Sequence, residues 1–579
     1  MNKNELITKL RELDSLTFEE KSQLIDLINR KRYGLVWEDK PEDAEEVLNE
    51  TLPVLSEVID KAIIYNSEKQ KNKTLFENSK DEIPNHILIE GDNLHALTTL
   101  CFTHENKIDV IYIDPPYNTG NKDFRYFDSR FEEVRDIDKE NPFRHSMWLS
   151  FMSKRLKIAK RLLKETGVTF ISIDDNEVAQ LKLLCDDIFR EENYLTTIVR
   201  RRRKTQANLT KNIAPVHEYI VCYAKNISSL QFNKLTYSKE FIKKSFSNPD
   251  KDSRGLYQTG PLARPENSSN KEYILEMPNG RKIKAKWSCS QETFDRYVQE
   301  KRLVIPREGK GMPRIKIFLN ETKGALPNTW WDDIASNEEG AKEIENIFGT
   351  NAAFIFPKPT DLIRTILQIA SNKNSVILDF FAGSGTTLHA TMALNSEDEG
   401  KRQCILVTDN ENKICEEVTY IRNKKVIEGY TKPNKEKVEG LVKNNFRYYK
   451  TAFVGREKTL KNKRQLTELA TDLLCIKENC YKEIKGAKQI RIFQENSISI
   501  VIIYDDIVIP NAVELIKKLP KDHTIKVYVF VEGQDPYTED FEEVLDRIQL
   551  CTLPDAIYKA YQNILPKKRK IEMEVETVN

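Results

Sequence analysis

The sequence predicts an α/β fold built on a sheet of parallel strands that helices cover on both faces. Short apolar runs ending in acidic or turn residues recur from about residue 85, at 86–90, 108–113, 168–173, 219–223, 376–378 and 404–407. Helix-length stretches such as 148–164 and 177–189 separate several of these runs. Strands this apolar, alternating with helices, are typical of a parallel sheet buried on both sides.

The composition agrees with a large globular protein. At roughly 150 residues per domain, 579 residues suggest about four domains. The 25 Phe and 22 Tyr exclude a disordered chain. No stretch approaches the roughly 18 apolar residues of a membrane span, and the start MNKNELITKL lacks the apolar core of a signal peptide. Nine scattered cysteines and seven dispersed histidines lead us to expect a cytoplasmic protein with reduced thiols and no metal site.

Changes of pattern divide the chain into five segments. Leucines at spacings of three and four predict a helical region over 1–84. The strand–helix alternation occupies 85–225 and 351–431, and between them 226–350 is rich in Gly, Pro, Ser, Asn and basic residues. After a Lys-rich join around Pro433, residues 432–579 have strand-like runs and amphipathic stretches of their own, which predict an α+β domain.

The balanced charge of the chain hides an uneven distribution. The total is +1, but residues 200–330 contain 27 Lys+Arg and 12 Asp+Glu, a net of +15, so the remainder carries −14. The segment opens with five basic residues and holds aromatic residues among its cations: Arg200, Arg201, Arg202, Arg203 and Lys204, then Phe232, Tyr237, Phe241, Tyr257, Tyr273 and Trp287. Such a mixture predicts contacts with nucleic-acid phosphates and bases; a solvated surface with clustered charge is the alternative.

The motif Asp114-Pro115-Pro116-Tyr117 follows the apolar run 108–113 directly. It therefore falls at the carboxyl end of a strand, where open α/β sheets place their ligand sites. The prolines fix the backbone and leave carbonyl groups free to accept hydrogen bonds. With a carboxylate and an aromatic ring beside them, the motif is suited to hold a flat ring that bears an amino group. A tight turn with a solvent-facing tyrosine is the alternative.

A second motif, 378–387 with the sequence LDFFAGSGTT, joins the run 376–378 to a helix-like stretch. Gly383 and Gly385 are two of only 20 glycines, and glycine permits a close approach of the backbone to a ligand. A dinucleotide fingerprint would have a third glycine where Leu388 stands, and no Gly-Lys-Ser/Thr follows to make a phosphate-binding loop. A turn that serves only packing is the alternative.

Two further acidic residues follow strand-like runs. Asp409 comes 30 residues after Asp379, where a nucleotide-binding fold places the acceptor for ribose hydroxyls; a cap for the helix predicted over 411–422 is the alternative. Asp92 follows the run 86–90 in the same way, with the same two interpretations. His217 precedes the run 219–223 and is either a structural histidine or a neighbour of the ligand pocket expected at the Asp114 motif.

These motifs together resemble those of the amino-methylating DNA methyltransferases. The catalytic motif at 114–117 precedes the cofactor motif at 379–387, and a basic segment separates them, as in the β group; Phe356-Pro357-Lys358-Pro359 resembles that group's motif X. The modification (Mod) subunits of type III restriction–modification systems are the most similar, through 32–37 (RYGLVW), 90–94 (EGDNL), 114–120 (DPPYNTG) and 378–387. Phe380 departs from the family, in which Pro is common.

The resemblance implies a Rossmann-like, S-adenosylmethionine-dependent methyltransferase sheet with circularly permuted motifs and an inserted target recognition domain at 226–350. It implies methylation of adenine N6 in double-stranded DNA after base flipping, with Asp114, Pro115, Pro116 and Tyr117 as catalytic residues and no metal. The cofactor would contact Asp92, Phe356, Lys358, Asp379, Phe381, Gly383, Ser384, Gly385, Thr386 and Asp409. A homodimer and a restriction (Res) helicase–nuclease partner are implied for the N-terminal and C-terminal regions.

The sequence features also bear on five alternatives. Methylation of cytosine N4, or of RNA, is one alternative; Asp114 favours adenine over cytosine N4 only moderately, because Ser is common there for cytosine N4. A solitary methyltransferase without a nuclease partner has the same sequence features. A fused restriction–methylation enzyme would need helicase motifs, which we do not find, and a non-enzymatic DNA-binding protein leaves both motifs unexplained. Methylation at C5 of cytosine would need a nucleophilic Cys, usually after Pro, and the chain has no Pro-Cys pair.

Overall fold

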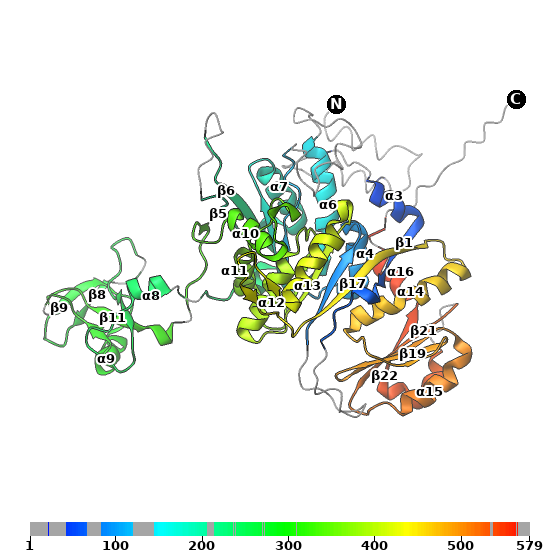
Figure 1. Ribbon diagram of the computed structural model, residues 1–579. Helices are drawn as coiled ribbons and strands as arrows, with labels where there is room; N and C mark the ends of the chain where they lie inside the picture. The colour runs from blue at the N-terminus through cyan, green and yellow to red at the C-terminus, as the bar shows by residue number, and fades with distance from the viewer. Residues whose placement is uncertain are drawn as a thin grey trace. The chain divides into compact units, whose positions relative to one another are not determined.

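The computed structural model describes residues 42–65, 83–119, 144–204, 213–235, 239–532 and 537–565, apart from 269, 271, 308, 309, 323 and 563, and also residues 21, 37 and 237. Most of the predicted helical region before residue 42, the residues 32–36 and Gly120 therefore lie outside the described residues. The chain divides into two compact units, Phe232–Asn328 and the remainder (Figure 1), and each is described by itself. Among the described helices, none is both long and apolar enough to cross a membrane.

The larger unit is built on a ten-stranded sheet in the order β1-β17-β2-β14-β13-β3-β4-β6-β5-β12. All six strands predicted from the apolar runs are present in it. They are β2 (Asn85–Glu90), β3 (Ile108–Ile113), β4 (Leu163–Ile173), β6 (His217–Ala224), β13 (Val376–Asp379) and β14 (Gln403–Thr408). Nearly every residue of β3 and β14 is buried, as expected of strands that are covered on both faces.

The sheet is mixed, so the prediction of a parallel sheet is correct only for its centre. The strands from β17 to β4 are parallel, whereas β6 is antiparallel to β4 and β5 (Tyr194–Arg201) is antiparallel to β6. No helix lies between β5 and β6 among the residues described there, and neighbouring strands joined without a crossover pair in antiparallel fashion.

Two sets of helices pack on the sheet. The helices α4 (Asn93–His104), α6 (Arg144–Leu162) and α7 (Val178–Phe189) contact one another in sequence. A second set contains α11 (Thr360–Ala370), α12 (Thr386–Asp398) and α13 (Ile421–Glu428). A π-helical segment at Ile414–Tyr420 leads directly into α13. The helices predicted at 148–164, 177–189 and 388–394 are thus present, and the stretch 411–422 is helical but irregular.

The sheet also contains strands from regions where none was predicted to join it. The prediction that 1–84 is helical is wrong at β1 (Thr51–Glu57), which follows helix α3 (Asp43–Glu50). β1 pairs with β17 (Asn445–Gly455), and β17 pairs with β2. The segment 432–579 therefore supplies a strand to the main sheet instead of beginning as a separate domain. Residues 52–55 of β1 are buried in succession, and β17 buries Asn445, Phe446, Tyr448 and Tyr449, so both faces of each strand are covered over these residues.

The rest of the C-terminal segment forms a second sheet, as its strand-like runs predict. Helix α14 (Leu460–Glu478) packs against β1 and β17 on one side and against this sheet through β20 (Figure 1). The strands are β18 (Glu483–Gly486), β19 (Ile490–Glu495), β20 (Ile498–Ile503), β21 (Thr524–Phe530) and β22 (Ile548–Leu553), with the helices α15 (Ile509–Lys517) and α16 (Asp555–Tyr561).

The smaller unit, Phe232–Asn328, lies inside the predicted segment 226–350. It has a three-stranded sheet, a hairpin and two helices: β7 (Tyr257–Pro261), β10 (Leu303–Val304), β11 (Arg314–Phe318), β8 (Glu272–Glu276), β9 (Lys282–Lys286), α8 (Lys239–Ser245) and α9 (Gln291–Gln299). The strand β12 (Trp330–Trp331) and helix α10 (Asn337–Phe348), predicted to belong to the inserted segment, are part of the larger unit.

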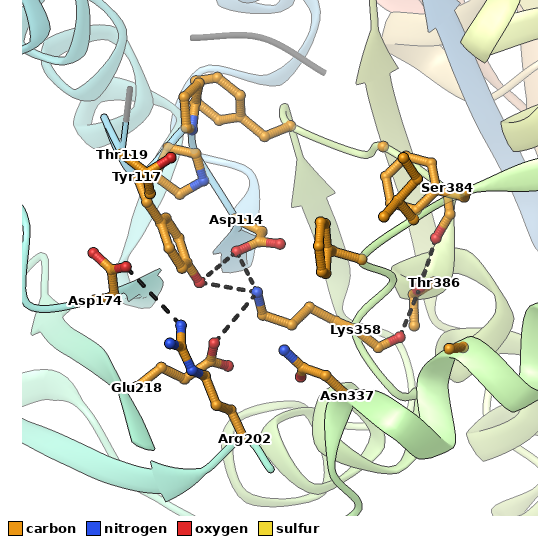
Figure 2. Close-up of a pocket in the computed structure, with 18 of the residues that line it drawn as sticks. Asp114, Tyr117, Thr119, Asp174, Arg202, Glu218, Asn337, Lys358, Ser384 and Thr386 are labelled. Atoms are coloured by element: carbon orange, nitrogen blue, oxygen red, sulfur yellow. Dashed lines mark hydrogen bonds and ion pairs between the residues drawn. The ribbon is translucent and has the colours of Figure 1, made fainter. Parts of the chain in front are cut away.

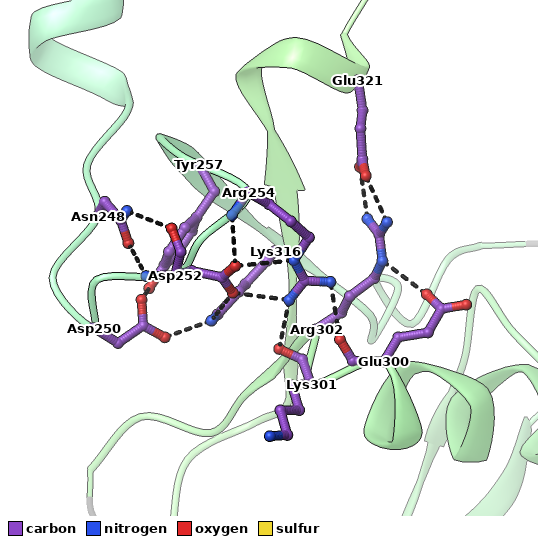
Figure 3. A network of polar contacts seen from close by, with 10 residues as sticks. All are labelled: Asn248, Asp250, Asp252, Arg254, Tyr257, Glu300, Lys301, Arg302, Lys316 and Glu321. Carbon is purple, nitrogen blue, oxygen red and sulfur yellow. Dashed lines mark hydrogen bonds and ion pairs between the residues drawn. The ribbon is translucent and has the colours of Figure 1, made fainter.

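A network of charged residues supports the smaller unit (Figure 3). The ammonium group of Lys316 on β11 is almost buried and is held by Asp250 and by Asp252, 2.9 Å away. Arg254 donates to both carboxylate oxygens of Asp252 and lies over the ring of Phe318, 4.3 Å from its centroid. Charges that are paired in this way are tolerated in a small core, so we interpret this network as structural.

Candidate active site

The two motifs lie side by side because they follow adjacent strands. β3 and β13 are parallel partners, with Val110 opposite Ile377, so both loops leave the same edge of the sheet. A cavity of about 850 Å³ opens there, and both motifs line it (Figure 2). Its lining includes Asp114, Pro115, Pro116 and Tyr117 from the first motif and Asp379, Phe381, Gly383, Ser384 and Thr386 from the second. Residues about 265 positions apart in the chain thus share one site.

In the first motif, the tyrosine and the aspartate are joined by a hydrogen bond. The hydroxyl of Tyr117 donates to Oδ1 of Asp114 at 2.8 Å. Burial, together with the charge of Asp114, raises the pKa of Tyr117 well above its ordinary value, so the phenol keeps its proton. This leaves Oδ2 of Asp114 as the carboxylate oxygen that is free of Tyr117.

The two proline carbonyls differ in their surroundings. The indole Nε1 of Trp148 on α6 donates to the carbonyl of Pro116 at 2.7 Å. Among the residues that the structure describes, none donates to the carbonyl of Pro115. Because an amide carbonyl is a strong acceptor, the Pro115 carbonyl and the Asp114 carboxylate are the acceptors that remain for a ligand.

A buried glutamate fixes the residue after the motif. Asn118 has a left-handed backbone conformation, with φ of 56°, and its side-chain amide donates to Glu177 at 2.6 Å and to the carbonyl of Arg144 at 3.3 Å. Glu177 is also 2.6 Å from Nδ1 of His145, whose pKa is lowered by burial and by Arg144. We did not predict these roles for Trp148, Glu177 and His145, because no local pattern relates them to the motif.

In the second motif, Asp379 lies at the floor of the cavity with its carboxylate buried. It accepts hydrogen bonds from the backbone N–H of Phe381 at 3.0 Å and the hydroxyl of Thr387 at 2.5 Å. Burial raises the pKa of Asp379 to about 7, although both hydrogen bonds act in the opposite direction. A carboxylate in this setting gains strongly from a cationic ligand.

The glycines of the loop are required by its shape. Gly383 has φ of +49°, and a Cβ there would lie 3.2 Å from the ring of Phe354. Gly385 has φ of +76°, and a Cβ would lie 2.4 Å from the side-chain nitrogen of Asn423. Gly385 begins helix α12 and does not line the cavity. The backbone at Gly383 is therefore open to the cavity, as the sequence predicts for a ligand loop.

A buried arginine supports this loop from below. Nη1 of Arg422 donates to the hydroxyls of Ser384 at 2.9 Å and Thr386 at 2.7 Å, and Nη2 is 3.3 Å from Glu343. Thr386 in turn donates to the carbonyl of Lys358. The hydroxyls predicted to contact a cofactor are thus engaged in orienting the loop.

The two acidic residues predicted to contact ribose or adenine are found as caps. Asp92 accepts a hydrogen bond from the backbone N–H of Leu94 at the start of α4, and it lies 3.6 Å from Arg155. Asp409 accepts from the backbone N–H of Glu411. Neither is among the residues that line the cavity. The alternative role as a cap is therefore present in both cases, and ligand contact stays a prediction.

The two residues of the motif-X segment behave differently. Phe356 is 42% exposed and lines the cavity. Lys358, predicted to contact the cofactor, instead contacts the first motif: its ammonium donates to Oδ1 of Asp114 at 2.7 Å and to the hydroxyl of Tyr117 at 2.9 Å (Figure 2). On its other side it is 3.7 Å from Oε2 of Glu218.

The basic run at 200–204 does not form one surface. The prediction of DNA contact is wrong for Arg200, which is buried on β5 and bound to Glu218 at 2.5 Å and to the carbonyl of Ala335. Side chains alternate along a strand, so Arg201 is exposed. Arg203 and Lys204 are also exposed, and Lys204 pairs with Glu339. The half-buried Arg202 lines the cavity together with Arg203.

Some of the aromatic residues predicted to stack on bases are core residues. Tyr257 and Trp287 are 5% and 2% exposed, so they cannot reach a ligand without unfolding the smaller unit. Phe241, in contrast, is 41% exposed and stacks on Tyr237 with ring centroids 4.9 Å apart. His217 contacts the hydroxyl of Tyr219 at 2.8 Å, and it is not one of the residues that line the cavity. No group of three or more metal-ligating side chains occurs among the described residues.

Comparison with known proteins places these motifs in a family. The model of a DNA methylase family matches residues 108–420. The chain is 38% identical to the StyLTI Mod subunit of a type III restriction–modification enzyme from Salmonella typhimurium, over 58% of this chain and 54% of that protein. It is 32% identical to the EcoPI Mod subunit from Escherichia phage P1, over 59% and 60%, and 34% identical to the type II methyltransferase M.KpnI from Klebsiella pneumoniae, over 60% and 84%.

The matched regions limit what these relatives establish. The chain spans between half and two thirds of the length of the two Mod subunits, and the match to the family model contains both cavity motifs. The chain belongs to the DNA methylase family.

Proposed function

We propose that this protein is an S-adenosylmethionine-dependent DNA methyltransferase that modifies adenine N6, and that it is the modification subunit of a type III restriction–modification system. The observation that carries the proposal is the shared cavity, in which an Asp-Pro-Pro-Tyr loop and a glycine loop with a buried aspartate face each other. Membership of the DNA methylase family supports the reaction class. The similarity to Mod subunits supports the assignment to type III.

The second motif fits S-adenosylmethionine. The buried carboxylate of Asp379 suits the ammonium group of the methionine portion, and Gly383 lines the cavity without a side chain of its own that would keep its backbone away from a ligand. The cavity volume of about 850 Å³ leaves room for a base beside the cofactor. When bound, S-adenosylmethionine supplies an activated methyl group on its sulfonium.

The first motif fits an exocyclic amino group. Such an amine is a weak nucleophile because its lone pair is delocalised into the ring. Hydrogen bonds from its two N–H groups to the Asp114 carboxylate and the Pro115 carbonyl would favour a pyramidal nitrogen with a localised lone pair. Tyr117 would orient the carboxylate through its hydroxyl and offer its ring to the base. Orientation and charge placement of this kind are the main contributions that methyl transfer needs.

The target base must leave the double helix to reach Asp114, because the cavity lies at the edge of the sheet. We assign DNA recognition to the smaller unit, Phe232–Asn328, which contains 20 Lys+Arg and 11 Asp+Glu, a net of +9. The exposed Arg201 and Arg203 would add phosphate contacts. The part of 432–579 that follows β17 would serve dimerisation and contact with a restriction subunit.

A transfer assay with purified protein tests the reaction. We expect the wild-type chain to transfer a radiolabelled methyl group to double-stranded DNA, and we expect Asp114→Ala and Tyr117→Ala to abolish the transfer. Titration calorimetry should show that both variants still bind S-adenosylmethionine. Near-normal turnover in the Asp114→Ala protein would contradict the catalytic assignment.

The chemical alternatives give different products. Mass spectrometry of the methylated nucleosides distinguishes N6-methyladenine from N4-methylcytosine, and an RNA substrate distinguishes the RNA alternative. Co-purification with a helicase–nuclease subunit from the source cells distinguishes a type III system from a solitary methyltransferase.

A further inference from the structure

The side chain of Lys358 occupies the position that a target amine would need. Its ammonium group donates to Asp114 and to Tyr117, which are the two side chains that the proposed reaction requires for the base. Lys358 is only 8% exposed, so its charge is largely removed from water. The ammonium uses Oδ1 of Asp114, and its Nζ lies 5.0 Å from the centroid of the Tyr117 ring, so it occupies space beside the carboxylate and over the ring that a bound base would need.

A second carboxylate lies on the far side of the ammonium. Oε2 of Glu218 is 3.7 Å from Nζ of Lys358, just beyond the length of a hydrogen bond. Glu218 is 1% exposed, and Oε1 is held by Arg200, which faces it from the neighbouring strand β5. Lys358, at the end of a flexible four-carbon chain, can therefore move while Glu218 stays fixed.

The charges around Glu218 favour its ionised form. Although burial alone would raise the pKa of Glu218, the charges of Lys358, Arg200 and Arg202 lower it below its ordinary value. The carboxylate is therefore available as a counter-ion throughout the neutral pH range. Moving the ammonium from Asp114 to Glu218 exchanges one anionic partner for another. Without Glu218, the same movement would leave a buried charge unpaired, which is strongly unfavourable.

We propose that Lys358 is a positioning residue that fills the target-amine subsite in the absence of DNA, and that Glu218 receives its ammonium group when the base enters. This inference rests on the proposed function, since it assigns a step of base capture to that site. This movement of Lys358 would favour a base whose amine can replace the ammonium as a donor to Asp114. Lys358 would also keep Asp114 paired when the cavity holds cofactor alone.

Base capture can be measured separately from methyl transfer. Once the recognised sequence has been mapped from methylated DNA, a duplex is prepared with 2-aminopurine beside the target adenine. The fluorescence of 2-aminopurine rises when its neighbour leaves the stack, so its titration with protein reports capture of the adenine. The variants are Lys358→Met, Glu218→Gln and the double variant, with the exposed Lys488→Met as a matched control.

The inference predicts opposite effects of the two single changes. Lys358→Met removes the competitor, so the fluorescence rise should be at least as large as in the wild-type protein and should occur at lower protein concentration. Glu218→Gln removes the receiving carboxylate, and we expect capture to weaken about tenfold or more. In the double variant, capture should return to within about threefold of Lys358→Met, because no ammonium remains to be moved. Lys488→Met should match the wild type.

Three outcomes would overturn the inference. Weaker capture in Lys358→Met would show that the ammonium assists the base and does not compete with it. Capture in the double variant that stays as weak as in Glu218→Gln would show that Glu218 does not act through the ammonium group of Lys358. Absence of methylated adenine in DNA treated with the wild-type protein would overturn the proposed function and this inference together, whereas a methylating wild type with unresponsive variants overturns the inference alone. If Lys358→Met is unstable by circular dichroism, Lys358→Gln carries the same expectation.

Discussion

Replacement of Asp379 by asparagine should stabilise the fold and weaken the cofactor site. The carboxyl of Asp379 is buried, and its pKa is raised by burial from 3.8 to about 7. A folded-state pKa above the unfolded value means that the folded protein holds a proton that the unfolded chain releases between these two pH values. The free energy of unfolding therefore falls by about 4 kcal/mol as the pH rises from about 4 to about 7, and this contribution is constant above that range. An Asn side chain is neutral and has no such dependence.

The magnitude is best measured as a difference between two pH values. Between pH 5 and pH 8, the stability that the Asn variant gains over the wild type should grow by about 3 kcal/mol, because two of the roughly three pKa units lie in this interval. Any pH-independent effect of the amide cancels in this difference. Urea unfolding followed by fluorescence and circular dichroism gives both free energies. The exposed Asp522→Asn serves as the control and should follow the wild type at both pH values.

The same ionisation should govern binding of the cofactor. If the Asp379 carboxylate accepts the ammonium group of S-adenosylmethionine, wild-type affinity should rise about fivefold between pH 6 and pH 7, following the ionised fraction of a group with a pKa of about 7. Calorimetric titration of Asp379→Asn should show weak binding without this dependence. A stability gain that is identical at pH 5 and pH 8 would refute the reasoning, because it would mean that the carboxyl is not protonated in the folded protein.

Three other changes test separate parts of the structure. Glu177→Ala should slow methyl transfer about a hundredfold with unchanged cofactor affinity, because Asn118 and the catalytic loop lose their anchor; normal single-turnover rates would contradict this. The double change Arg201→Gln and Arg203→Gln should weaken DNA binding and reduce the slope of log affinity against log salt concentration by about two. Arg200→Gln should keep that slope and lower the free energy of unfolding by about 3–5 kcal/mol. Equal slopes in all variants would oppose the assignment. Lys316→Met should speed hydrogen exchange in 250–260 and 314–318, and unchanged protection there would show that the charge network is dispensable.

Much of the fold could be predicted because it depends on local patterns. The apolar runs at 108–113 and 376–378 are strands since burial on both faces demands continuous apolar residues, and the loops after them are marked by Pro and Gly. The joining of β17 to β2 could not be predicted, because strand order in a sheet depends on contacts between residues about 360 positions apart. The antiparallel strand β6 has an apolar run like those of the parallel strands, so its direction was not readable either.

The two motifs of the candidate site were predicted from the sequence, but the residues that contact and orient them were not. Asp114 follows β3 directly and Asp379 is the last residue of β13, and because these strands are neighbours the two residues lie at the same edge of the sheet. Glu218 and Arg200 are charged residues on strands, and only the facing direction of each side chain shows that they are buried partners. Lys358 lies 244 residues from Asp114, and its contact depends on the path of the segment before α11. Charge counting likewise treated Arg200 and Arg201 as equivalent, although alternate residues of a strand point to opposite faces.

We propose that the Asp114 and Asp379 loops form one site for methylation of adenine N6 in DNA. The most direct measurement is mass spectrometry of nucleosides from the DNA of cells that lack adenine methylation and express either the wild-type chain or Asp114→Ala. We expect N6-methyladenine in the first DNA and none in the second, at equal protein levels. DNA that contains only N4-methylcytosine, or N6-methyladenine that persists with Asp114→Ala, would contradict it.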